Sequence, residues 1–103
     1  MGENMKITKI SENGVPVLLI SGQLAAPAAA FFEEALGKGL GDKKEIILDF
    51  SGVEFIASAV LRVLLSVEKK LKLQSGGITI RNANAVVTEV FNLTGIKDFI
   101  NVI

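Results

Sequence analysis

A short, nearly continuous apolar segment, EIILDF at residues 45–50, constrains the fold most. Neighbouring residues of a strand point to opposite faces of a sheet, so this segment predicts a strand buried on both faces, as in a parallel sheet. Parallel strands need a crossover connection, which is usually a helix. The flanking sequence should therefore alternate between strand and helix patterns.

Three further segments have strand patterns, at residues 5–10, 15–20 and 77–81. The dipeptide Asn13-Gly14 separates the first two and predicts an antiparallel hairpin. Residues 51–56 are interpreted as a loop, and residues 97–103 as a short final helix or strand.

Helix patterns lie between these strands. Alanines and Pro27 favour a helix over residues 25–40, in which Phe31 and Phe32 belong to an apolar stripe that is expected to face the core. The second helix starts at Ala57 or Ser58 and runs to about Leu73, and the third runs from Asn82 or Asn84 to Thr94, with Gly95 as a left-handed stop. The expected fold is a single α/β domain over residues 1–103, with a mostly parallel four-stranded core sheet, an antiparallel N-terminal edge strand and helices packed against it.

Composition excludes several kinds of chemistry. The chain has no histidine, cysteine, tryptophan or tyrosine, which removes serine–histidine and cysteine–histidine catalysis and thiolate or imidazole zinc sites. We therefore expect no enzymatic activity, no cofactor and no metal. Lysine plus arginine equals aspartate plus glutamate at 11 each, which gives no electrostatic reason to expect nucleic acid or direct membrane contact. No apolar run spans a bilayer and no signal-peptide core opens the chain, so a cytoplasmic protein is expected.

One hydroxyl stands out in FIASAVL, residues 55–61, where Ser58 lies among apolar neighbours at the predicted start of the second helix. Serine is among the best helix caps, and capping alone would explain this residue. A phosphate there would instead add a charge of about −1.5 to −2, next to a helix N-terminus that tolerates it.

Three stretches resemble the STAS family, the fold of bacterial anti-sigma factor antagonists. They are LISGQL at residues 19–24, ILDFSGVEFIASAVL at residues 47–61 and VFNLTGI at residues 90–96. The resemblance implies a regulatory module, a monomer or weak dimer, that binds an anti-sigma factor with kinase activity and is controlled by phosphorylation of Ser58. The implied partner surface comprises Gly22, Gln23, Leu24, Ala25, Ala26, Ile56, Ala57, Ser58, Ala59, Val60 and Arg62.

The chain departs from the family pattern around the serine. Ala57 and Ala25 stand where the family usually has acidic residues, and Ala59 replaces a second serine. This leaves an alternative open: a STAS module that does not switch, in a transport-associated assembly or as a small-ligand or nucleotide-binding domain.

Other charged residues are interpreted as structural. Asp49, at the expected strand end, and Glu54, in the expected loop, are expected to be solvated or hydrogen-bonded rather than an acid–base pair. The basic run at residues 69–72 is expected to be a solvated helix end.

Overall fold

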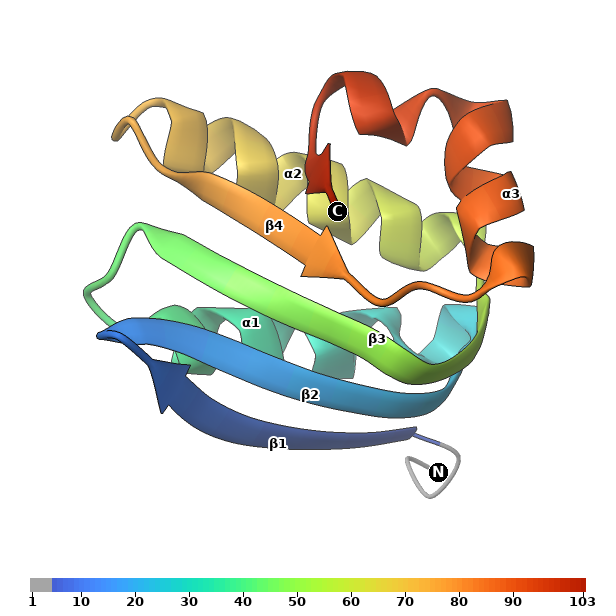
Figure 1. The fold of residues 1–103 in the computed structure, drawn as a ribbon, viewed down its shortest axis with the longest axis horizontal. Coiled ribbons are helices and arrows are strands. Elements are labelled where there is room, and N and C mark those ends of the chain that lie inside the picture. The colour runs from blue at the N-terminus through green and yellow to red at the C-terminus, as the bar shows by residue number, and fades with distance from the viewer. Residues whose placement is uncertain (1–4) are drawn as a thin grey trace.

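The computed structural model describes residues 5–103. Its strands form one five-stranded sheet in the order β1-β2-β3-β4-β5, in which β1 is antiparallel to β2 and all other neighbours are parallel. The predicted α/β fold is confirmed, with β5 as a short fifth strand. The elements are β1 (Met5–Glu12), β2 (Val15–Leu24), the 3-10 helix η2 (Ala26–Ala28), α1 (Ala29–Leu40), β3 (Glu45–Ile56), α2 (Ser58–Lys72), β4 (Gly77–Arg81), α3 (Ala85–Thr94), the 3-10 helix η3 (Ile96–Asp98) and β5 (Asn101–Val102) (Figure 1).

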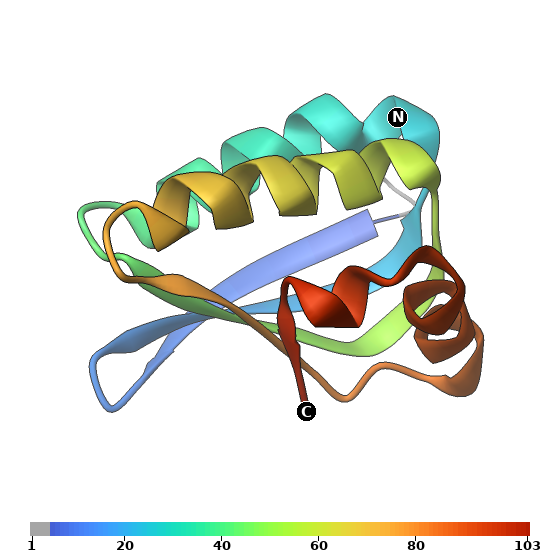
Figure 2. The same cartoon turned by 90° about the horizontal axis from the view of Figure 1, so that it is seen from above.

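The helices α1 and α2 lie side by side over one face of the sheet (Figures 1 and 2). Leu48, at the centre of β3, and Leu64 of α2 are fully buried in the core between these layers. The helix α3 packs near the end of β3, where the ring centroids of Phe91 and Phe50 are 6.1 Å apart. Leu48 and Phe50, on one face of β3, are fully buried. On the opposite face, Ile47 is only half-buried and Asp49 is hydrogen-bonded to the Arg81 side chain. The prediction of a strand buried on both faces is therefore only partly correct.

The expected apolar stripe of α1 is only partly correct. Phe32 is fully buried, whereas Phe31 is 52% exposed. Consecutive residues of an α-helix point about 100° apart, so only one of the two rings can face the sheet.

The strand β3 is longer than the sequence indicated. Residues 51–56, interpreted as a loop, continue the strand and pair with the end of β2, so Asp49 lies inside a strand rather than at its end. Gly52 makes this pairing possible, because a Cβ atom at that position would lie 2.6 Å from the Cβ of Ser21. The pairing contains two register shifts, which bend the two strands together.

The ends of α3 match the sequence signals. Asn84 is its N-cap and accepts a hydrogen bond from the Val87 N–H at 2.8 Å. Gly95 follows the last turn with φ of 74°, the left-handed conformation expected of a glycine stop.

Candidate functional site

The bent ends of β2 and β3 lead into one corner of the molecule, at the N-terminus of α2. The last pair of the ladder is Leu24 with Ile56, and the next N–H, that of Ala57, donates to the Leu24 carbonyl at 2.8 Å. This bond places residues 22–26 directly beside residues 55–59. The structure therefore brings together the two segments that the resemblance indicated, although they are about 30 residues apart in the chain.

Ser58 is not the cap of α2. The cap position belongs to Ala57, whose backbone is extended and whose side chain makes no capping bond, and Ser58 is the first helical residue. Capping by Ser58 was wrong because β3 continues to Ile56, which leaves a single extended residue before the helix. The Ser58 side chain is exposed, and its hydroxyl is not committed to the end of the helix.

Only some of the expected surface residues are accessible. Leu24, Ile56 and Val60 are at most 3% exposed, so their side chains support the surface from beneath. Those of Gln23, Ala26, Ser58 and Arg62 are exposed, and Gly22, Ala25, Ala57 and Ala59 are half-buried.

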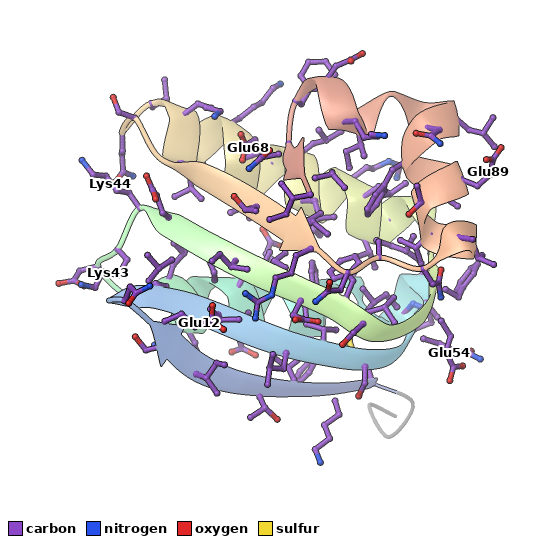
Figure 3. All side chains as sticks on the ribbon, in the orientation of Figure 1. Glu12, Lys43, Lys44, Glu54, Glu68 and Glu89 are labelled. Atoms are coloured by element: carbon purple, nitrogen blue, oxygen red, sulfur yellow. The ribbon has the colours of Figure 1, made fainter. Side chains whose placement is uncertain are left out.

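Phe55 belongs to this corner and was missed as a surface residue. Its side chain is 46% exposed, whereas the neighbouring Ile56 is buried, because the two point to opposite faces of β3. Glu54 is exposed and points away from the end of β3 (Figure 3). The sequence would have shown which residue is exposed only if residues 51–56 had been interpreted as a strand.

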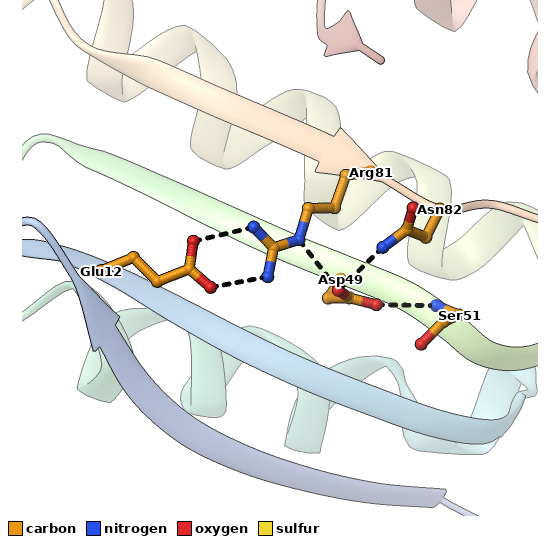
Figure 4. Close-up of polar contacts among 5 residues, drawn as sticks. All are labelled: Glu12, Asp49, Ser51, Arg81 and Asn82. Atoms are coloured by element: carbon orange, nitrogen blue, oxygen red, sulfur yellow. Dashed lines mark hydrogen bonds and ion pairs between the residues drawn. The ribbon is translucent and has the colours of Figure 1, made fainter.

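A charged cluster joins β1, β3 and β4 at the middle of the sheet (Figure 4). Arg81 donates two parallel hydrogen bonds to Glu12, at 2.9 and 2.8 Å, and a third from Nε to Asp49 at 2.8 Å. Asp49 also accepts from the Ser51 N–H at 2.9 Å and from the Asn82 amide at 3.0 Å. Asp49 is therefore hydrogen-bonded, as predicted.

These bonds shift the titration of the cluster. Burial disfavours the charged form of Asp49, but the bonds from Ser51 and Arg81 outweigh it and lower the pKa to about 2. The hydrogen bonds from Arg81 also lower the pKa of Glu12. Both carboxylates are thus ionised near neutral pH and matched by Arg81. This cluster links β1, β3 and β4, and each of its charged side chains is already hydrogen-bonded.

The corner offers one functional group of interest, the Ser58 hydroxyl, with a small apolar rim. Within residues 5–103, no group of three or more carboxylates is placed to hold a metal ion. In the same residues, no helix is long and apolar enough to cross a membrane. The corner therefore presents an exposed hydroxyl among small side chains.

Comparison with known proteins identifies the family. The family model of the STAS domain matches residues 6–103, and the chain therefore belongs to the STAS domain family. A curated relative, the anti-sigma-F factor antagonist RsfB of Mycobacterium tuberculosis, is 34% identical over 70 residues, which cover 67% of this chain. That alignment spans 57% of the length of RsfB.

Solved structures share the fold. An anti-sigma factor antagonist from Mycobacterium paratuberculosis superimposes with a TM-score of 0.84 at 24% identity, covering 95% of this chain and 84% of that one. The anti-sigma factor antagonist SpoIIAA in its unphosphorylated form gives a TM-score of 0.76 at 17% identity, covering 96% of this chain and 87% of that one. At these identities the likeness concerns the arrangement of the elements.

Proposed function

We propose that the protein is an anti-sigma factor antagonist that binds a kinase-type anti-sigma factor and is released by phosphorylation of Ser58. The observation that carries the proposal is the exposed Ser58 hydroxyl at the start of α2, free of any capping role, in a STAS fold. The relationship to RsfB, named as an antagonist of an anti-sigma factor, supports the choice of partner.

The proposed contact surface has two parts. One is the exposed portion of residues 22–26, and the other comprises Phe55, Ala57, Ser58, Ala59 and Arg62. Small side chains around the hydroxyl allow a partner to approach closely, and Phe55 supplies an aromatic anchor at the edge.

Phosphorylation would oppose this contact by desolvation. The Ser58 oxygen attacks the γ-phosphorus of ATP, the bond to the ADP oxygen breaks, and the hydroxyl proton passes to a base of the kinase, which also supplies the metal ligands. The phosphate carries a charge of about −1.5 to −2 and is surrounded by the small apolar side chains next to Ser58. A partner packed on that rim would have to remove water from the phosphate, whereas the free N–H groups at the start of α2 stabilise it within the domain.

The test uses the kinase-type anti-sigma factor encoded in the same genome. Binding is measured by calorimetry, and the product formed with ATP is mapped by mass spectrometry. We expect phosphate on Ser58, none on a Ser58→Ala variant, and weakened binding of a Ser58→Asp variant. The matched control is Ser66→Ala, which removes another exposed serine of α2 and should change neither result.

Two outcomes would contradict the proposal in different ways. Tight binding without phosphate on Ser58, together with unchanged binding of Ser58→Asp, would indicate an antagonist that does not switch. Absence of any binding to the anti-sigma factors of the genome would remove the proposed partner class.

A further inference from the structure

A groove of about 810 Å³ runs along α2 where the helix faces η3, and one of its lining residues, Arg62, lies one helical turn after Ser58. Leu65 of α2 and Phe99, which follows η3, provide apolar walls, and the Phe99 ring is 62% exposed. The volume lies within the range of about 300–1,000 Å³ that is usual for small-molecule sites. An exposed aromatic ring beside such a groove indicates that an apolar group fits there.

The charged side chains that line the groove are mostly positive when the ion pair of Lys72 with Glu68 is set aside. Lys72 pairs with Glu68 at 3.2 Å, and Glu68 is 3% exposed and accepts the Ile78 N–H at 2.7 Å. Figure 3 shows Glu68 between α2 and β4, where its carboxylate is already engaged. Arg62 and Lys69 remain, against the single carboxylate of Asp98. Within residues 5–103, none of these three side chains forms an ion pair.

We propose that this groove binds a small amphiphilic carboxylate. The acyl or aryl body of the ligand rests between Leu65 and Phe99, and the carboxylate is held by Lys69 and Arg62. The two cations supply the charge complementarity, and the apolar walls favour a ligand that also has an apolar body. This inference concerns the groove between α2 and η3, and it does not depend on phosphorylation of Ser58.

Arg62 connects the groove with the proposed partner surface. It lies one helical turn after Ser58, and residues four apart on a helix are neighbours. A carboxylate held by Arg62 would therefore withdraw this side chain from the partner surface, which gives the groove a route to influence binding there.

The test is an NMR titration of the isotopically labelled protein with octanoate. Two comparison ligands separate the two parts of the proposal: acetate, which has the charge without the apolar body, and 1-octanol, which has the body without the charge. We expect octanoate to shift the resonances of Leu65, Lys69 and Phe99 in a saturable way, at dissociation constants of about 1 mM or tighter. Acetate should cause no saturable shift, and octanol should bind at least about three-fold more weakly.

Variants locate the site. Lys69→Gln and Phe99→Ala should each weaken octanoate binding by about three-fold or more. The matched controls are Lys70→Gln, the next lysine of α2 and outside the groove, and Leu93→Ala, an exposed apolar residue of α3. Neither control should change binding.

Three results would overturn the proposal. They are shifts that do not saturate, equal binding of octanol and octanoate, and groove resonances that shift with protein concentration alone. The last would show that a second copy of the chain, rather than a small carboxylate, occupies the groove.

Discussion

Two regions of the molecule with polar side chains differ in whether those side chains are already hydrogen-bonded. In the cluster of Arg81, Asp49 and Glu12, each charged side chain is hydrogen-bonded to another member, and Asp49 also holds Ser51 and Asn82. At the corner around Ser58, the hydroxyl is exposed and does not cap the helix that it begins. The first region stabilises the fold, and the second leaves a functional group available for a partner.

The difference shows that a polar residue in an apolar segment can have either of two roles: it can stabilise the fold through hydrogen bonds, or it can leave its polar group available for a partner. Asp49 lies in an apolar strand where several hydrogen-bond donors surround it, so replacing it should lower the free energy of unfolding markedly. Ser58 interrupts an apolar segment without such partners, so its removal should cost little stability. The following measurements test that contrast, from the largest expected effect to the smallest.

The largest effect is expected for Asp49→Ala. The change leaves Arg81 Nε, the Ser51 N–H and the Asn82 amide without their acceptor in a partly buried place. We expect a loss of about 2–3 kcal/mol in the free energy of unfolding, measured by urea denaturation. Glu34→Ala is the control, because Glu34 forms an exposed pair with Lys38 at 4.0 Å and should cost no more than about 0.5 kcal/mol. Equal losses of stability in Asp49→Ala and Glu34→Ala would show that the cluster around Asp49 does not stabilise the fold more than an exposed ion pair.

Acid should weaken the same cluster. The folded pKa of Asp49, about 2, lies below its ordinary value of 3.8, so this group stabilises the fold above that value and loses its contribution as the pH falls toward 2. The stability gap between wild type and Asp49→Asn should therefore narrow as the pH falls from about 4 to about 2. Urea denaturation at several pH values checks this, and a constant gap would show that Asp49 stabilises mainly by its shape.

A smaller loss is expected for Asn84→Ala. Asn84 caps α3 by accepting from the Val87 N–H, and its amide donates to the Val53 carbonyl at 2.9 Å. We expect a loss of about 1–2 kcal/mol in thermal or urea unfolding. Asn92→Ala, on the exposed side of the same helix, serves as the control and should change little.

The smallest effect is expected for Ser58→Ala. A capping serine would cost about 1 kcal/mol on replacement, but Ser58 is the first helical residue, where alanine is well tolerated. The free energy of unfolding should change by less than about 0.5 kcal/mol. A loss as large as that of Asn84→Ala would show that the hydroxyl has a structural role after all.

Local patterns predicted most elements of this fold, because each helix and strand has its own periodicity and stop signals. The bounds of α2 and β4 and the left-handed stop at Gly95 were all predicted. The extension of β3 was not, because Ser51-Gly52 has the composition of a turn and its strand pairing depends on β2. The pair of Glu12 and Arg81, which are 69 residues apart, has no local signal at all.

The candidate site shows the same limit. The serine and both segments beside it could be found from the sequence, whereas the choice of exposed residues could not. Phe55 and Ile56 are adjacent apolar residues, and only the pairing of Ile56 with Leu24 shows which one faces the core. The helix cap was misplaced by one residue for the same reason.

The bond from the Ala57 N–H to the Leu24 carbonyl has a consequence for engineering. It joins two distant stretches of chain into one discontinuous epitope, so no linear peptide from this protein should reproduce the surface around Ser58. An inhibitor that mimics the corner would need both stretches, held in the same relative orientation by a rigid scaffold. Conversely, an antibody raised against the folded corner should fail to recognise the denatured chain.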